Sequence, residues 1–325
     1  MKLILKKIVI FLPLLVLTYF LVLFLIAVTP IKKLIPTIKS NTGGPGQSLL
    51  RFREAENIRD IDFLIVGSSH ASKGFDNRLF SKQNISTFNL GTGLQTPQNT
   101  YYLLEKYVPS IQPKRIIMEL FWDVLEYENG NEACIDITSN SPISFEMFKM
   151  NCSTKEVKPI TSMLVNYFSR SRESLAACEQ KTIPGETYVS GGYLESIHDD
   201  EAARKAIAGI QPRRLMLNEK QLGYLKKIIS YCKTQNTPLI FVTAPVPDEL
   251  LNSLSNYPSV VKDISRILNS ANVEWLNFND EHYRNDLKLN SIEDFNDYNH
   301  LSQTGVIKFN SLLIERLKNT AVANK

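Results

Sequence analysis

The sequence is poor in the residues that build metal and redox sites. Its 325 residues include only four cysteines and four histidines. No two cysteines form a C-x-x-C pair, and no histidine stands beside them at the spacing of zinc ligands, which argues against a zinc site. The chain also has no P-loop, H-E-x-x-H or G-x-S-x-G motif, and Gly91-Thr92-Gly93 lacks the rest of a dinucleotide fingerprint. We therefore expect neither a metal nor a cofactor.

A basic surface is also missing once the N-terminal lysines are set aside. The formal net charge is +4, from 37 basic and 33 acidic residues. Six lysines flank one apolar segment, and no acidic residue does: Lys2, Lys6, Lys7, Lys32, Lys33 and Lys39. Without these six, 31 basic residues stand against 33 acidic ones, a net charge of −2. Because nucleic-acid binding requires a basic face, we do not expect a nucleic acid as partner.

The apolar segment runs from Ile8 to Thr29. Its length matches the roughly 20 residues that cross a bilayer as a helix. It is longer than the apolar core of a cleaved signal peptide and no A-x-A site follows it, so we interpret it as a transmembrane signal anchor. Lysines on both sides leave the orientation undecided by the positive-inside rule. We expect residues 1–7 in the cytoplasm, and the body on the periplasmic or extracellular side of the inner (cytoplasmic) membrane.

Beyond the anchor, the chain divides into a linker and one large body. Residues 30–59 include the stretch SNTGGPGQS, which is typical of a tether. Residues 60–320 alternate short apolar runs with helical patterns, and residues 321–325 form a tail. The predicted strands are Phe63–Ser68, Thr87–Leu90, Arg115–Leu120, Pro238–Ala244 and Val273–Phe278. The predicted helices are Gln98–Val108, Glu219–Cys232, Ser259–Leu268 and Val306–Leu317.

These strand runs are continuously apolar rather than alternating, which is typical of strands covered on both faces in a parallel sheet. Their alternation with helices predicts an α/β fold, a three-layer doubly wound (flavodoxin-like) parallel sheet of about five strands. Residues 123–215 do not fit this pattern, because they carry no clear strand. A structureless loop of that length is improbable in a compact domain. We interpret it as a partly helical insertion, with helices over Phe145–Tyr167 and Asp199–Ile210, that folds over one end of the sheet.

The cysteines bear on this insertion. Cys134, Cys152 and Cys178 all lie within it, and an even count in an exported body permits disulfides, most plausibly among these three. Cys232 falls in an apolar helical pattern and is expected to be buried.

Two short motifs, more than two hundred residues apart, carry the chemistry. Gly67-Ser68-Ser69-His70 follows the first predicted strand, and Asp297-Tyr298-Asn299-His300 precedes the last helix. Either one alone is weak, because glycine–serine pairs usually form turns and aspartates commonly cap helices. Both, however, fall at the carboxyl ends of predicted strands, where α/β sheets bind ligands. Together they supply a nucleophile, a base and a carboxylate that orients the base, as acyl transfer requires.

Other polar residues are weaker candidates. His282 competes with His300 as base, and Asp294 competes with Asp297 as the orienting carboxylate, although it lies six residues from His300. His198 stands in a polar run and is expected to be solvated. His70 follows the nucleophile and is interpreted as a polar turn residue.

On these motifs the chain resembles the SGNH (GDSL-like) hydrolase superfamily, most closely its membrane-anchored DltD-like and alginate-O-acetylation-like acyltransferases. The first block of that superfamily, usually Gly-Asp-Ser, reads Gly67-Ser68-Ser69 here, so Ser69 is the matching nucleophile. The last block, Asp-x-x-His, matches Asp297 and His300. The resemblance covers most of residues 60–320 outside the insertion, and implies the same fold and a Ser-His-Asp triad.

The resemblance also implies an oxyanion hole. The second block of the superfamily carries a glycine whose N–H lines this hole, and it looks like Asn89-Leu90-Gly91-Thr92-Gly93 here. Which of the two glycines corresponds to the family's glycine stays open. We favour the N–H of Gly93, acting together with the N–H of Ser69. The third block normally carries an asparagine donor, but here it reads Leu120-Phe121-Trp122-Asp123, so that donor is missing. Trp122 is predicted to line a substrate groove, since aromatic faces suit sugar rings; a core or lid tryptophan is the alternative.

The residues and the resemblance together predict an exported, membrane-anchored serine acyltransferase or esterase. Acyl groups, with acetyl favoured by the resemblance, would pass to a cell-envelope polysaccharide or to water. The expected partners are the glycan acceptor and a multispanning membrane acyltransferase. A non-catalytic SGNH-like subunit that binds glycan or scaffolds a complex is the alternative from another class. A lipid esterase, with an apolar tunnel beneath the insertion, is the third hypothesis.

Overall fold

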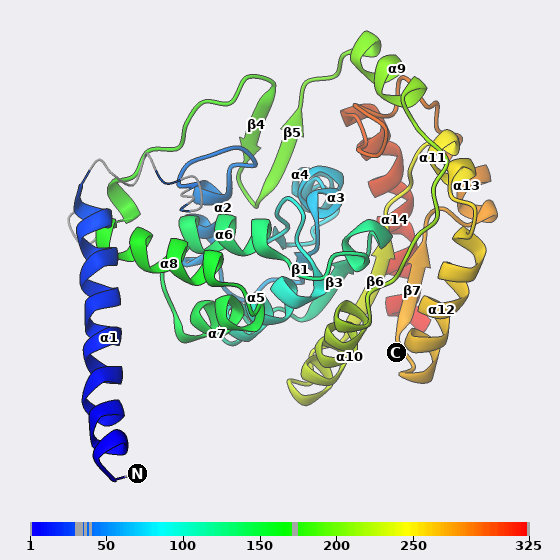
Figure 1. Cartoon of the computed structure of the whole chain (residues 1–325). Coiled ribbons are helices and arrows are strands. Elements are labelled where there is room, and N and C mark those ends of the chain that lie inside the picture. Colours follow the sequence, from blue (N-terminus) through cyan, green and yellow to red (C-terminus); the bar gives the residue numbers. More distant parts are fainter. Residues whose placement is uncertain (1, 30–34, 36–37, 39–40, 171–174, 324–325) are drawn as a thin grey trace.

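The computed structural model describes residues 2–29, 35, 38, 41–170 and 175–323, so parts of the predicted tether and the last two residues of the predicted tail lie outside it. Its centre is one parallel sheet in the order β2-β1-β3-β6-β7 (Figure 1). The five strands are β1 Phe63–Val66, β2 Thr87–Asn89, β3 Arg115–Glu119, β6 Leu239–Thr243 and β7 Glu274–Asn277. Numbered among themselves, these strands run 2-1-3-4-5, the flavodoxin-like order, which confirms the predicted fold class.

Helices cover both faces of the sheet because successive residues of each strand point to opposite sides. Leu64 and Val66 of β1 belong to one apolar core, and Phe63 and Ile65 belong to the other. The first core is closed by α5 Pro97–Ile111, α10 Glu219–Thr234 and α12 Tyr257–Ser270. The second is closed by α3 Ser69–Gly74, α4 Asn77–Ser81, α13 Glu281–Leu287 and α14 Gln303–Ala323. The short α11 Asp248–Ser253 completes the body.

The insertion is richer in structure than predicted. Its elements are α6 Asn131–Asn140, α7 Phe145–Ser153, α8 Val157–Arg170, the antiparallel strands β4 Glu186–Val189 and β5 Tyr193–Ser196, and α9 Asp200–Ala208, with 3₁₀ turns at Trp122–Leu125 and Leu175–Ala177. The prediction that it carries no strand is therefore wrong. The helix predicted over Phe145–Tyr167 is two helices, because Lys155 between them has a left-handed backbone with φ of 60°.

Two of the cysteines expected to form a disulfide are not joined in the structure. Cys134 is buried in α6 while Cys152 is exposed on α7, and no disulfide connects the two. Cys232 is buried, as predicted.

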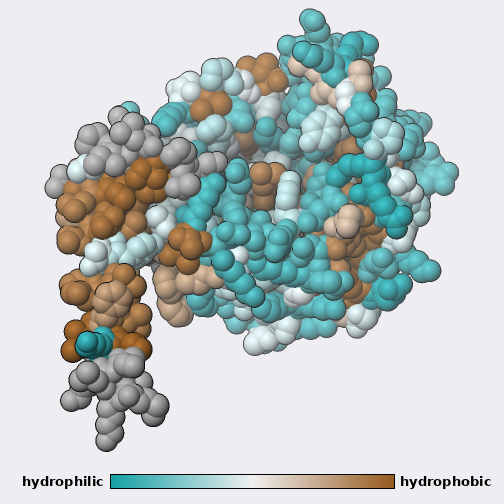
Figure 2. Space-filling model, viewed as in Figure 1, coloured by the Kyte–Doolittle hydropathy of each residue, from teal (hydrophilic) through white to brown (hydrophobic). Residues whose placement is uncertain are grey.

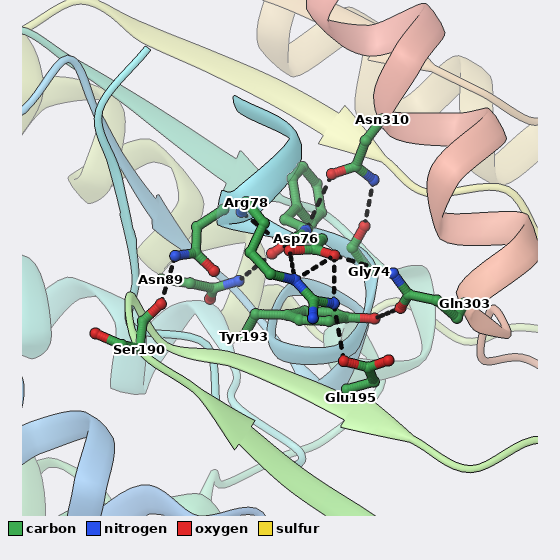
Figure 3. Close-up of polar contacts among 11 residues, drawn as sticks. Gly74, Asp76, Arg78, Asn89, Ser190, Tyr193, Glu195, Gln303 and Asn310 are labelled. Atoms are coloured by element: carbon green, nitrogen blue, oxygen red, sulfur yellow. Dashed lines mark hydrogen bonds and ion pairs between the residues drawn. The ribbon is translucent and has the colours of Figure 1, made fainter. Parts of the chain in front are cut away.

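A polar cluster fastens the β4–β5 hairpin to the body (Figure 3). The carboxylate of Asp76 accepts hydrogen bonds from Arg78 and from the Gln303 amide, and Arg78 also pairs with Glu195 of β5. The Tyr193 hydroxyl donates to Gln303 at 2.5 Å. Since Gln303 begins α14, these contacts hold the hairpin beside the helix that follows the histidine motif.

The segment predicted as a tether is partly folded onto the body. Helix α2, Ser48–Ala55, lies within it and buries Phe52 in the first core. Ahead of α2, the N–H of Gly43 donates to Asn140 at 2.8 Å, and the N–H of Gly46 donates to Glu186 at 3.1 Å. The glycines and proline therefore correctly indicated that the described stretch directly ahead of α2 has no regular structure. It is not a free tether, however, because these backbone N–H groups donate to side chains of the insertion.

The N-terminal helix α1, Lys2–Val28, is docked against α8 (Figure 1). The hydroxyls of Tyr19 and Thr161 lie 3.0 Å apart, and the Ser169 hydroxyl donates to the carbonyl of Ala27 at 3.1 Å. Residues 7–28 form the one helix of the described chain that is long and apolar enough to cross a membrane. Figure 2 shows its apolar surface standing out from a largely hydrophilic body.

Candidate functional site

The predicted nucleophile stands on a sharp turn at the end of β1, which we call the nucleophile turn (residues 67–70). Gly67 has φ of 146°, and a Cβ there would come within 2.7 Å of the Cβ of Glu119, so only glycine fits. Ser68 caps α3 by accepting the N–H of His70 at 3.2 Å. Ser69 is the first residue of α3. In flavodoxin-like sheets the ligand crevice opens between the first and third strands, and β1 and β3 end at that crevice.

The predicted base stands on a second segment, the base loop (residues 297–300), between α13 and α14. One oxygen of Asp297, Oδ1, accepts the backbone N–H of Asn299 at 2.9 Å and that of His300 at 2.8 Å. These two bonds close the loop into a tight turn. The spacing D-x-x-H follows from this geometry, because the turn brings the aspartate side chain back to the imidazole three residues later.

The three residues form a continuous hydrogen-bonded chain. His300 Nδ1 lies 2.8 Å from Asp297 Oδ2, and His300 Nε2 lies 2.8 Å from Ser69 Oγ. A carboxylate can only accept, so Nδ1 carries the proton and Nε2 is left to accept the Ser69 hydroxyl. This is the tautomer that a general base requires.

The charge on Asp297 is held by its hydrogen bonds. Burial acts to raise the pKa of this carboxyl, but the His300 ring and the N–H groups of Asn299 and His300 outweigh burial and lower the pKa below its usual value. Asp297 is thus ionised at neutral pH and stabilises an imidazolium on His300.

A buried carboxyl that sequence reasoning missed lies behind the nucleophile. Glu119, at the end of β3, is 2% exposed, and its Oε2 accepts the N–H of Ser68 at 3.0 Å and the Ser68 hydroxyl at 2.8 Å. Burial raises the pKa of Glu119 to about 7, against the lowering effect of these two bonds. The sequence held a signal for it, since an acidic residue within a strand covered on both faces must bind a polar partner.

Two backbone N–H groups are available as oxyanion donors. Ser69 begins α3, so its N–H has no acceptor within the helix. Gly93 is exposed, and its N–H makes no hydrogen bond within the part of the chain that the structure describes. The N–H of Thr92 donates to the carbonyl of Gly67 at 3.2 Å and so holds this loop against the nucleophile turn. The assignment of the Ser69 and Gly93 N–H groups as the pair of oxyanion donors stays a prediction.

Gly93→Pro tests this donor, because proline removes the N–H. We expect kcat to fall by about 10²–10³-fold, as for loss of one oxyanion donor. Gly93→Ala is the matched control: a Cβ at Gly93 would meet nothing within 4 Å and the N–H is kept, so it should retain kcat. Kinetics with an activated acetyl ester measure both variants. Equal activity of the proline and alanine variants would remove Gly93 from the oxyanion hole.

The prediction for Trp122 is not supported. Its side chain is only 2% exposed and packs against Phe121 and Tyr257, with ring centroids 4.9 Å away in each case. The ring belongs to the first apolar core and presents no face to a sugar. The neighbouring Asp123 forms an ion pair with Arg213.

The alternative residues lie elsewhere. His282 is exposed on α13 beside Tyr283. Asp294 is fully buried and pairs with Lys308 at 2.7 Å. His198 bonds to Asn296 and Asp200. Among the described residues, His300 is therefore the candidate base that bonds to Ser69, and Asp297 is the carboxylate that bonds to His300.

A groove of about 630 Å³ lies beside the base loop. Tyr298, 44% exposed, forms one wall of it, and helix α9 and Leu250 form others. Ala202, Ala206 and Ile210 give it an apolar floor, while Lys205 and Arg213 also line it. The groove meets the base loop at Tyr298, which is its aromatic residue in place of the predicted Trp122; Ser69, Asp297 and His300 do not line it.

Comparisons with known proteins give only distant likenesses. No family model and no curated protein matches the chain. Solved structures to which it is similar include a GDSL-like lipase from Bacteroides thetaiotaomicron, 8% identical over 85% of this chain and 98% of the other, with a TM-score of 0.43. Another is the psychrotrophic esterase EstA from Pseudoalteromonas sp., 12% identical over 81% and 99%, with a TM-score of 0.41. The activity therefore has to be argued from the site itself.

Proposed function

We propose that this protein is a membrane-anchored serine esterase or acyltransferase that acts on acyl groups of a cell-envelope polysaccharide. One observation carries the proposal. Ser69 Oγ, His300 Nε2 and Asp297 form a chain with both links at 2.8 Å, although serine and histidine lie 231 residues apart in the sequence. A nucleophile, its base and the orienting carboxylate are thereby assembled at the carboxyl end of the sheet.

The reaction follows from the geometry. As Ser69 Oγ bonds to the carbonyl carbon of an acyl ester, its proton passes to His300 Nε2. The N–H groups of Ser69 and Gly93 stabilise the oxyanion. The leaving alkoxide takes the proton from His300 as its bond to carbon breaks, which leaves an acyl group on Ser69. An acceptor hydroxyl, from a sugar or from water, then loses its proton to His300 as it attacks the acyl carbon. The bond between that carbon and Ser69 Oγ breaks, and Oγ takes the proton back from His300.

The envelope location rests on helix α1. The docking of α1 on α8 would hold the catalytic body at a set place on the outer surface of the inner (cytoplasmic) membrane. Phe145 and Phe148 of α7 are 68% and 45% exposed, so the insertion also presents aromatic side chains at its surface. Such a surface suits a multispanning acyltransferase as partner, because anchoring both proteins raises their effective concentration.

The groove beside Tyr298 supports a second candidate. Its apolar floor of Ala202, Ala206 and Ile210 suits an acyl chain longer than acetyl, as in a lipid esterase. The non-catalytic scaffold is disfavoured, because a scaffold does not require a serine, a histidine and an aspartate joined by hydrogen bonds.

One assay separates these functions. The full chain, in detergent micelles, would be given acetyl, butyryl and octanoyl esters with and without soluble envelope glycan, and both the free acid and the acylated glycan would be measured. We expect the acetyl ester to give the highest kcat/KM and the glycan to take acyl groups in preference to water. Fastest turnover of the octanoyl ester would favour the lipid esterase. No turnover by folded protein would favour the scaffold.

A further inference from the structure

The proposed function assigns no role to the second histidine of the site. His70 directly follows the nucleophile and was interpreted as a polar turn residue, but its side chain is buried, with 4% exposed. Its ring stacks on Phe121 at 3.7 Å and on His300 at 4.8 Å between centroids. The imidazole of His70 therefore forms part of the surface against which the base rests.

Both ring nitrogens of His70 face a polar atom. Nε2 lies 2.9 Å from the backbone carbonyl of Asn299, which can only accept, so Nε2 carries the proton. Nδ1 then carries no proton, and the oxygen of the Ser68 hydroxyl lies 3.3 Å from it. The single proton of that hydroxyl is donated to Glu119 at 2.8 Å, so it is not available to Nδ1. His70 thus links the nucleophile turn to the base loop through one direct hydrogen bond, across 229 residues of sequence.

The position of that bond matters. The peptide of Asn299 lies between Asp297 and His300, and its N–H already donates to Asp297. The His70 bond holds the carbonyl of the same residue, so the base loop is fastened from the aspartate side and from the nucleophile side. If the His70 bond were lost, one hydrogen bond among the described residues would still join the base loop to the nucleophile turn, the one between His300 and Ser69. A displacement of about 1 Å there can cost about 10²-fold in rate.

We propose that His70 is a positioning residue, which sets the separation between the Ser69 hydroxyl and the His300 ring by holding the Asn299 carbonyl. This inference rests on the proposed function, since it concerns the same triad. It assigns His70 no contact with the substrate.

The charges around His70 agree with this role. Burial, and then repulsion from His300, hold the pKa of His70 well below its usual value; Asp297 and the Asn299 carbonyl act in the opposite direction, and Lys73 adds to the lowering. Glu119 faces the ring only through Ser68. A neutral His70 adds no repulsion when His300 takes the proton of Ser69.

A matched pair of substitutions isolates the bond. In His70→Gln the side-chain amide reaches the place of Nε2 and can still donate to Asn299, whereas in His70→Asn it is too short. Both remove the ring and its stacking, so losses of stability should be similar. We expect His70→Asn to lower kcat about 10²-fold with KM within about threefold, and His70→Gln to recover most of kcat. His282→Gln, at an exposed site on α13, is the control for loss of a histidine.

A second measurement does not depend on turnover. Amide hydrogen exchange at Asn299 and His300 reports the bonds of the base loop, and should be faster in His70→Asn than in His70→Gln. Equal kcat and equal exchange in the two variants would overturn the inference. Failure of the proposed function would give a different result. Ser69→Ala would then keep the activity of the wild type, while amide exchange would still be faster in His70→Asn than in His70→Gln.

Discussion

Ser69→Ala is expected to lower kcat by at least about 10³-fold and to abolish labelling by a fluorophosphonate, because the nucleophile of the triad is removed while binding is kept. The hydroxyl lies 2.8 Å from His300, so no other serine of the nucleophile turn shares its base. Steady-state kinetics with an acetyl ester and gel-based detection of the probe, both on the full chain in detergent, measure the two effects.

Ser68→Ala is the matched control, one residue away. The Ser68 hydroxyl bonds to Glu119 and faces His70 rather than His300, so its loss should slow the reaction and leave labelling in place. Labelling that survives in folded Ser69→Ala but disappears in Ser68→Ala would assign the nucleophile to Ser68 and contradict the triad.

Asp297→Asn is expected to lower kcat by about 10³–10⁴-fold at neutral pH, because the amide can no longer stabilise the imidazolium or hold Nδ1 protonated. Asparagine keeps one oxygen, which can still accept the N–H groups of Asn299 and His300 and preserve the turn. The loss should therefore appear in kcat with little change in the melting temperature, and the two measurements are made on the same protein.

Asp294→Asn tests the competing carboxylate. Asp294 bonds to Lys308 and to the N–H of Asn290. It makes no hydrogen bond to His300, so its replacement should lower stability and leave the kcat of the folded protein within about threefold of the wild type. An equal fall in kcat for the Asp294 and Asp297 variants would mean that Asp297 is not the orienting group.

Local pattern was enough to predict the sheet and four of the helices that cover it, α5, α10, α12 and α14, but not α3, α4 and α13. Runs such as Phe63–Val66 are apolar at every position, and in a strand that is possible only when both faces are covered. The helices α5 and α10 follow from apolar periodicity and from start signals such as the Thr96 cap of α5. The observed boundaries of these elements differ from the predicted ones by a few residues, which is usual for the ends of helices and short strands.

The β4–β5 hairpin was missed because its strands carry no such pattern. Each is four residues long, and β4 is only half-buried. Its turn is set by Gly192, where φ is 93° and a Cβ would come within 2.1 Å of the Asn89 carbonyl. The hairpin is held by contacts with β2 and α14, and a short two-stranded ribbon is marginal without such support.

The sequence by itself predicted the three groups of the candidate triad. Ser69, Asp297 and His300 were identifiable because each follows a recognisable element and because D-x-x-H places carboxylate and imidazole within one turn. Only the tertiary structure decided the environment of those groups. It brought serine to histidine at 2.8 Å, buried Trp122 in the core, and placed Glu119 and His70 behind the triad. Burial and stacking depend on contacts between segments far apart in the sequence, from 51 residues for Ser68 and Glu119 to 231 residues for Ser69 and His300, and no local pattern of residues records them.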